Sequence, residues 1–296
     1  MRRWGWLPAT TKTFDLFSYR HGFHAGNHAD VLKHCVLVQL LAHMAAKEKG
    51  FSFVDTHAGA GSYSLGSDFA RKKSEFEGGI GRLWKAPGLP AALEAYLAQV
   101  RALNRDGRLH FYPGSPQIAL QMMRPQDRLH LFELHSTESE VLQAYFAKPD
   151  RRVAVRAADG FAGLKSVLPP PSRRGLVLID PSYEDKQDYA RVLDTLRDAL
   201  KRFATGIYAV WYPLVQRKEA HRMAAELEKI AGGDWLHVSL KICAPPEDGM
   251  GLYGSGLFVF NPPWNLEGIL RQAMPALARL LGQDGKGSFK LQFRQT

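Results

Sequence analysis

A short acidic and aromatic motif past the middle of the chain is the first place where the residue types suggest chemistry. The apolar run Gly175-Leu-Val-Leu-Ile179 leads directly into Asp180-Pro-Ser-Tyr183. A continuous run of this kind is typical of a strand buried on both faces of a parallel sheet, and such folds bind ligands at the carboxyl ends of their strands. The Asp180 carboxylate and the Pro181 carbonyl can accept the two hydrogens of an amino group. The Tyr183 ring offers a flat surface on which a base can stack.

This motif differs at one position from the Asp/Asn-Pro-Pro-aromatic signature of methyltransferases that act on exocyclic amino nitrogens. The N6 lone pair of adenine is delocalised into the ring, so acceptors for both N6 hydrogens help to make the nitrogen a nucleophile. The rest of the catalytic effect is mostly positioning. Ser182 replaces a proline that would fix φ at about −65°, and we expect this to affect the rate more than the reaction type. The sequence thus predicts Asp180, Pro181 and Tyr183 as catalytic residues.

A second motif, Asn261-Pro-Pro-Trp264, matches the same signature more closely and follows the apolar run 256–260. It lies too far along the chain, however, to follow the fourth strand of such a fold. A pair of prolines after a strand also simply ends that strand. We therefore predict a structural role for Asn261 and a catalytic role for Asp180.

A glycine-rich turn earlier in the chain indicates a cofactor site. The β-rich run 51–54 ends at Asp55-Thr-His-Ala-Gly-Ala-Gly61, and glycines at 59 and 61 allow close approach to the backbone. Ser64 stands where a dinucleotide-binding fingerprint has its third glycine, which disfavours a hydride-transfer enzyme. An acid followed by x-x-x-Gly-x-Gly instead matches the S-adenosylmethionine loop of Rossmann-like methyltransferases. An ordinary glycine turn without any ligand is the alternative interpretation.

Two further acidic residues follow predicted strands. A carboxylate can hold a ribose diol, and Leu129-His-Leu-Phe-Glu133 is an alternating strand that ends on one. The strand 152–156 precedes Asp159-Gly160, where such enzymes hold the adenine amino group, although this dipeptide is also common in simple turns. The predicted cofactor-binding residues from these strands and turns are Asp55, Gly59, Gly61, Glu133, Asp159, Gly160 and Asp180.

The spacing of these motifs predicts how the chain is divided. Asp55 and Glu133 are much further apart than the first two acids of a compact nucleotide-binding fold, so an insertion must separate them. Apolar residues at helical spacing over 91–103 predict that this insertion is helical. We expect an N-terminal extension at 1–17, a methyltransferase domain at 18–61 and 114–296, and a small helical insertion subdomain at 62–113. The predicted fold class is α/β, a Rossmann-like class I S-adenosylmethionine-dependent methyltransferase.

Composition and charge limit the possible surroundings and partners. The 296 residues are 45% apolar and 23% charged, which is typical of a globular protein. The longest apolar stretch, 31–46, is broken by charged and histidine residues and is too short to cross a bilayer, so we expect no membrane contact. The two cysteines favour reduced thiols and a cytoplasmic protein. The net charge of +10 suggests a polyanionic partner, although each small basic cluster alone would also fit a solvated face.

Four histidines, at 21, 24, 28 and 34, lie close together and raise the question of a metal site. Zinc needs four ligands, and Asp30 is the only nearby carboxylate that could join them. We therefore predict no metal. Histidines that line a cofactor cavity or contact RNA phosphate are the favoured interpretation.

Several long motifs together resemble one known family. They are Ser18–His34, Asp180-Pro-x-Tyr183, Lys201–Pro213 and Ser255–Trp264. In order and spacing they are similar to the bacterial 23S ribosomal RNA adenine-N6 methyltransferases named for adenine 2030, from about Ser18 to the C-terminus. The resemblance implies transfer of a methyl group from S-adenosylmethionine to that adenine, with 23S ribosomal RNA as partner and a monomeric enzyme.

The resemblance also implies roles for individual residues. The residues implied to contact S-adenosylmethionine or shape its cavity are Lys33 or His34, His57, Ser115, Glu133, Asp159, Gly160 and Asp180. Tyr19 is the implied substrate contact near the start of the chain, and Tyr183 would contact the same RNA. A packing role against the long helix is the alternative for Tyr19.

Two alternatives from other classes stay open at this point. The first is a DNA adenine-N6 methyltransferase that shares the catalytic loop, and the second is an RNA-binding protein whose methyltransferase fold is inactive. The sequence has no added DNA-reading helix-turn-helix, which favours RNA over DNA. Ser182 is the only feature that favours the inactive fold.

Overall fold

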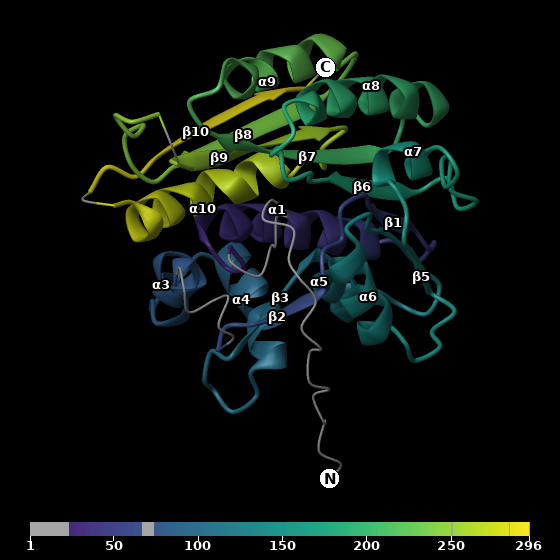
Figure 1. Ribbon diagram of the computed structural model, residues 1–296, viewed down its shortest axis with the longest axis horizontal. Coiled ribbons are helices and arrows are strands. Elements are labelled where there is room, and N and C mark those ends of the chain that lie inside the picture. The colour runs from purple at the N-terminus through teal and green to yellow at the C-terminus, as the bar shows by residue number, and fades with distance from the viewer. Residues whose placement is uncertain (1–23, 67–73, 250, 284, 296) are drawn as a thin grey trace.

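The computed structural model describes residues 24–66, 74–249, 251–283 and 285–295 (Figure 1). Tyr19, His21, the expected extension 1–17 and the basic residues 71–73 lie outside the described residues. The helices are α1 His28–Ala45, η2 Glu75–Gly78, α3 Ile80–Trp84, α4 Ala91–Leu103, α5 Ser115–Met122, α6 Ser136–Tyr145, α7 Gly160–Leu164, α8 Gln187–Arg202, α9 Lys218–Ile230 and α10 Leu266–Leu281. The strands are β1 Ser52–Asp55, β2 Ser62–Ser64, β3 Phe111–Pro113, β4 Arg128–Phe132, β5 Val153–Arg156, β6 Gly175–Ile179, β7 Ile207–Leu214, β8 Trp235–Lys241, β9 Gly254–Phe260 and β10 Ser288–Arg294.

Eight of these strands form one sheet in the order β10-β8-β9-β7-β6-β1-β4-β5. The five strands from β5 to β7 in this order run parallel, whereas β9 is antiparallel to both β7 and β8. The strand order reverses at β1, because β4 lies on one side of it and β6 on the other. All residues of β1 and β6 are buried, as expected of central strands with helices on both faces. The α/β fold with a mostly parallel sheet is therefore confirmed.

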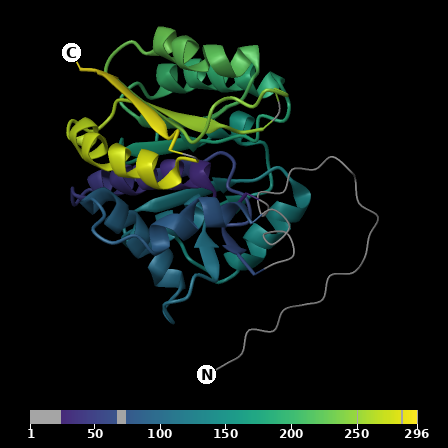
Figure 2. The ribbon, with the colours of Figure 1, turned by 90° about the vertical axis from the view of Figure 1, so that its left-hand side faces the viewer.

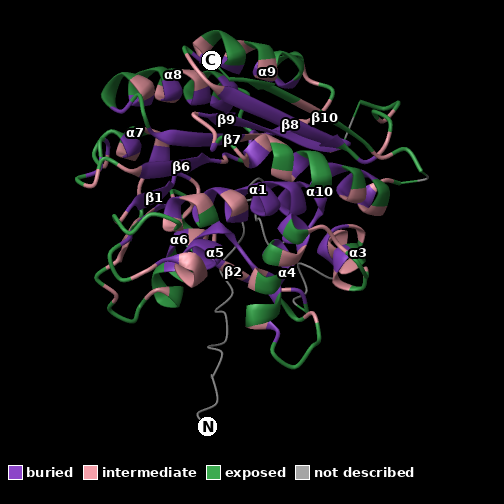
Figure 3. Cartoon of the chain, turned by 180° about the vertical axis from the view of Figure 1, so that it is seen from behind, coloured by how far each residue is buried: buried purple, intermediate pink, exposed green. Residues whose placement is uncertain are grey.

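Helices cover the two faces of the sheet and create two hydrophobic cores. α1 and α10 lie on one face, whereas α8 and α9 lie on the other (Figures 1 and 2). Helix α1 is buried along most of its length because it packs against the sheet on one side and against α4 and α10 on the other. Figure 3 shows the contrast between this helix and the exposed outer surfaces of α8 and α9. Polar residues on α1 are therefore held inside the protein.

Residues 62–113 contain the predicted helix, α4 Ala91–Leu103, together with a two-stranded ribbon of β2 and β3. The apolar side of α4, which includes Leu93, Tyr96 and Val100, belongs to the same core as Val31 and Cys35 of α1. The helix is confirmed, but its core is shared with the rest of the fold. The division into a domain and an inserted subdomain stays a prediction.

Both cysteines are free thiols, with Cys35 buried and Cys243 half-buried. Among the helices that the structure describes, none is long and apolar enough to cross a membrane.

Candidate active site

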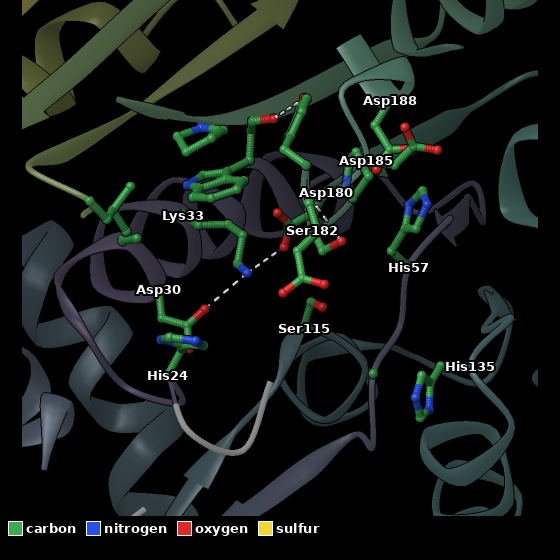
Figure 4. A pocket seen from close by; sticks show the side chains of 18 of the residues that line it. His24, Asp30, Lys33, His57, Ser115, His135, Asp180, Ser182, Asp185 and Asp188 are labelled. Carbon is green, nitrogen blue, oxygen red and sulfur yellow. Dashed lines mark hydrogen bonds and ion pairs between the residues drawn. The ribbon is translucent and has the colours of Figure 1, made fainter. Parts of the chain in front are cut away.

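A cavity of about 970 Å³ opens at the carboxyl ends of β1, β4 and β6 (Figure 4). Its walls come from α1, from the loops after these strands and from the start of α5. This is the position at which the strand order reverses, where open α/β sheets bind their ligands. The motifs selected from the sequence therefore converge on one place, although they are far apart along the chain.

The glycine turn after β1 and the acid after β4 are bound to each other. The Gly59 amide donates to Glu133 Oε2 at 2.8 Å, and the His135 amide donates to Glu133 Oε1 at 2.8 Å. Gly59 has a φ of +59°, and a Cβ there would lie 2.3 Å from the Tyr63 hydroxyl oxygen, so a side chain at this position would strain the backbone and displace that hydroxyl. Each carboxylate oxygen of Glu133 thus accepts one hydrogen bond from a backbone amide. A second position on each oxygen can serve a diol in the cavity.

Asp55 lies behind the wall of the cavity. Its side chain is fully buried and accepts hydrogen bonds from the Ser115 hydroxyl at 2.6 Å and from the His57 amide at 3.2 Å. Burial raises the pKa of Asp55 to about 7, against the effect of the Ser115 hydrogen bond. Ser115 and His57 line the cavity, whereas Asp55 and Gly61 are absent from the described lining. Asp55 therefore orients the residues in front of it.

The loop after β5 packs closely against the loop after β1. A Cβ on Gly160 would lie 1.9 Å from the Thr56 carbonyl oxygen, so a side chain at this position would separate the two loops. Asp159 Oδ1 accepts a hydrogen bond from the Phe161 amide at 2.9 Å and thereby caps α7. The His57 ring meets the Phe161 ring edge to face, and burial lowers the pKa of His57 to about 4. His57 is thus a neutral side chain at neutral pH.

The predicted catalytic carboxylate is bound to a buried lysine. The Lys33 ammonium donates to Asp180 Oδ2, and it also contacts Asp30 Oδ1 at 2.9 Å (Figure 4). Burial opposes the charge on Lys33, but the two carboxylates outweigh it and hold the pKa of Lys33 above its usual value. The ammonium also lies 5.8 Å from the ring centre of Trp211. Lys33 therefore stays protonated, and its positive charge lies against the Asp180 carboxylate.

The family resemblance implies a cofactor contact for Lys33 or for its neighbour His34, and His34 has different partners from Lys33. Its Nδ1 lies 2.7 Å from the Tyr112 hydroxyl, which in turn lies 2.9 Å from the Tyr96 hydroxyl. His34 lines the cavity from the end of this buried network. Sequence reasoning missed Trp211, and it considered Asp30 only as a metal ligand and missed its ion pair with Lys33. The i,i+3 spacing of Asp30 and Lys33 on a helix was the signal that could have revealed the ion pair.

Tyr183 is packed inside the protein. Its side chain is 2% exposed, its hydroxyl donates to the Trp211 carbonyl at 2.7 Å, and its ring centre lies 4.6 Å from that of Tyr189. Tyr183 has a φ of +55°, which is uncommon for a residue with a side chain. Base stacking needs an exposed ring face, and this conformation covers most of the ring. The stacking role of Tyr183 stays a prediction.

The rest of the motif shapes the loop. Pro181 lines the cavity, and Ser182 Oγ accepts a weak hydrogen bond from the Glu184 amide at 3.5 Å. Local hydrogen bonds of this type stabilise turns, so Ser182 contributes to the loop by a different means from the proline of the usual signature.

The second motif lies elsewhere. The Asn261 amide donates to the carbonyl oxygens of Ala204 and Gly206 at 2.7 and 2.6 Å, which fastens the end of β9 to the loop before β7. Trp264 is 79% exposed. Neither residue lines the cavity. The structural role that the sequence predicts for this motif agrees with these contacts.

Three of the four clustered histidines, His24, His28 and His34, lie within the described residues. His24 Nδ1 lies 2.8 Å from Glu75 Oε2, and His28 is buried at the start of α1. Within the described ranges, no three His, Cys, Asp or Glu side chains are grouped so that they could hold a metal ion.

The arrangement as a whole defines a class of protein. A glycine turn after the first strand, an acid after the next strand of the sheet and an Asp-Pro-x-aromatic loop across the reversal point together make this chain a Rossmann-like class I methyltransferase.

Comparison with known proteins identifies the family within this class. Residues 48–295 match the family described as "Ribosomal RNA large subunit methyltransferase D, RlmJ". The chain is 48% identical over 272 residues to ribosomal RNA large subunit methyltransferase J of Escherichia coli (strain K12), covering 92% of this chain and 96% of that protein. The protein of the same name from Haemophilus influenzae is 44% identical over 279 residues, covering 94% and 99%. The chain therefore belongs to the ribosomal RNA large subunit methyltransferase J family.

A solved structure shares the fold. A protein from Legionella pneumophila str. Philadelphia 1 superimposes with a TM-score of 0.82 at 34% identity, covering 91% of this chain and 98% of that one.

Proposed function

We propose that this protein transfers a methyl group from S-adenosylmethionine to N6 of an adenine in large-subunit ribosomal RNA. The family resemblance makes adenine 2030 of 23S ribosomal RNA the expected target. The observation that carries the proposal is the Asp180 carboxylate, which Lys33 holds in the same cavity as the Glu133 carboxylate. One site can thus hold an amino group and a ribose together.

The described lining of the cavity suits S-adenosylmethionine. Its carboxylates are Asp30, Glu133, Glu138, Asp159, Asp180, Glu184, Asp185 and Asp188, and its cationic side chains are Lys33, Arg191 and Arg217. This excess of negative charge favours a cationic ligand. When bound, S-adenosylmethionine supplies an electrophilic methyl group on a sulfonium. Glu133 has acceptor positions for two ribose hydroxyls, and the glycine turn leaves room for close approach to the backbone.

Asp180 and Pro181 would hold the adenine amino group. The Asp180 carboxylate, which is bound to the Lys33 ammonium, can accept one N6 hydrogen, while the Pro181 carbonyl can accept the other. Asp180 does not have to be a strong base, because the N6 proton becomes acidic as the new bond forms. The main contribution of these residues is therefore orientation of the nitrogen lone pair.

Tritium transfer from labelled S-adenosylmethionine tests the proposal. Protein-free 23S ribosomal RNA, assembled large subunits and duplex DNA are offered in parallel, and the product is mapped to a nucleotide by mass spectrometry. We expect transfer to one adenine of the RNA. Label in DNA alone would support the DNA alternative, and S-adenosylmethionine binding without any transfer would support the inactive fold.

A pair of matched variants tests the choice of loop. Asp180→Ala should abolish transfer and keep much of the cofactor affinity, because its acceptor role matters mainly as the nitrogen attacks. Asn261→Ala changes the residue at the same place in the second motif and should keep most of the rate. An inactive Asn261 variant beside an active Asp180 variant would mean that the other loop is catalytic.

A further inference from the structure

The end of the sheet opposite the cavity carries a concentration of positive charge. The parallel strands begin at this end, so the segments that enter β1, β4, β5 and β6 lie along one edge. Exposed basic residues occur in each of these segments. They are Lys47, Lys49, Arg128, Arg151 and Arg173, which we call the basal basic patch.

Hydrogen bonds fasten these segments to one another. Arg124, which precedes β4, donates to the carbonyl oxygens of Ala45 and Lys47 at 2.8 and 2.7 Å. Arg174, which precedes β6, donates to the carbonyl oxygens of Met44 and Lys49. Both guanidinium groups thus satisfy carbonyls at the negative end of the α1 dipole. These two arginines have structural roles, and they join the segments that enter β1, β4 and β6. The Arg152 guanidinium donates to the Met123 carbonyl at 3.1 Å and joins the segment before β5 to the one before β4.

The charge of the basal basic patch is not balanced locally. Its five members form no ion pair with any residue in the described part of the chain. Of the nearby acids, Asp127 and Asp150 are already paired, with Arg124 at 3.0 Å and with Arg152 at 2.6 Å, so the exposed Glu48 offsets only part of the charge of the five cations. Burial and then the positive charges of Lys47 and Arg174 lower the pKa of His43, as expected beside an excess of cations. An anion at this edge would relieve the repulsion.

The lining of the active-site cavity does not attract a polyanion such as RNA. Its described lining has more carboxylates than cations, although the whole chain has a net charge of +10. RNA affinity comes largely from neutralised phosphates, so the phosphate contacts must lie mainly on other surfaces. We propose that the basal basic patch binds the phosphate backbone of the RNA substrate, at the opposite end of the sheet from the target adenine.

This inference rests on the proposed function, because it takes the polyanion to be the RNA that is methylated. The five-residue strand β6 separates the two ends of the sheet by only about 17 Å. An RNA with a folded arm next to the target can therefore contact both ends at once. A short stem-loop that covers only the cavity cannot reach the basal basic patch.

Charge reversal at the basal basic patch tests the inference. The variant Arg128→Glu/Arg151→Glu/Arg173→Glu is compared with a control that changes the net charge equally on α9, β8 and α10. The control is Arg222→Glu/Lys241→Glu/Arg279→Glu, whose residues are likewise exposed and outside the cavity. RNA affinity is measured against salt concentration, once with a 23S fragment that keeps the arms around the target and once with a minimal stem-loop.

We plot the logarithm of RNA affinity against the logarithm of salt concentration. In the basal variant the magnitude of this slope should be smaller by about three, one for each lost phosphate contact. Between about 50 and 200 mM salt, the wild type should then lose roughly 60-fold more affinity for the long fragment than the variant does. The KM for this RNA should rise, while kcat, S-adenosylmethionine affinity and stem-loop binding stay near wild type. The control variant should keep the wild-type slope.

Two results would overturn the inference. One is a wild-type slope in the basal variant, and the other is an equal loss in the basal and control variants, which would indicate a general effect of net charge. If the glutamate variant does not fold, the neutral variant Lys47→Gln/Lys49→Gln tests the same surface and should lose about two from the slope. A wild-type protein that binds but never methylates RNA would refute the proposed function alone, because the affinity comparison would still decide the role of the patch.

Discussion

Replacing Lys33 with methionine is the sharpest test of the active site. Methionine keeps an unbranched side chain of similar length but removes the cation that Asp30 and Asp180 share. Lys33 is 5% exposed, so water cannot easily replace it. Breaking a buried ion pair by removing one partner costs about 3 to 5 kcal/mol of unfolding free energy. We expect a loss in this range, measured by urea denaturation.

The same substitution should slow methyl transfer. Without Lys33, two neighbouring carboxylates face each other in a buried site, and one of them takes up a proton. The Asp180 carboxylate also loses a charged hydrogen bond worth about 1.5 to 3 kcal/mol, which corresponds to a rate roughly 10- to 150-fold lower.

The double variant Asp30→Asn/Lys33→Met separates stability from catalysis. It removes the repulsion between the two carboxylates and should therefore regain part of the lost unfolding free energy, with a measurable coupling between the two sites. The missing cation still leaves Asp180 without its partner, so the rate stays low. If Lys33→Met keeps both the wild-type stability and the wild-type rate, the ion pair does not organise this site and the reasoning is wrong.

Three further predictions concern residues around the cavity. Gly160→Ala should destabilise the fold in thermal melts, because its Cβ would lie 1.9 Å from the Thr56 carbonyl oxygen; an unchanged melting temperature would contradict this packing. Asn261→Ala should lower stability by roughly 1 to 3 kcal/mol, because two carbonyl oxygens lose their donor, and a variant as stable as the wild type would refute the fastening role. Burial raises the pKa of Asp55 to about 7, so the folded carboxyl keeps a proton that the unfolded chain releases near pH 4. The contribution of this proton to stability is full below about pH 4 and is lost as the pH rises towards 7. The unfolding free energy of the wild type minus that of Asp55→Asn should therefore fall by a few kcal/mol between about pH 4 and 7. A constant difference would show that Asp55 has an ordinary pKa.

The sequence by itself determined the main elements and the loops that carry the chemistry. The run Gly175–Ile179 is observed as β6 with the predicted bounds, and α4 covers the predicted 91–103. Both patterns depend on which positions within one segment are apolar, a continuous run in β6 and a helical spacing in α4, so the segment itself contains the information. An acid at the end of a parallel strand must also lie at the ligand-binding edge, whichever order the strands take. For these reasons Glu133 and Asp180 could be selected before the fold was seen.

Only the tertiary structure decided which side chains meet. Lys33 and Asp180 are 147 residues apart in the sequence, and their contact exists because α1 packs under the end of β6. The start of α5 likewise places Ser115 in front of Asp55, and α8 and β7 cover the ring of Tyr183, although both residue types suggested direct contact with a ligand. Burial and partners depend on neighbouring elements from distant parts of the chain. No local pattern contains that information, because a loop residue of the same type can line a cavity or support its wall.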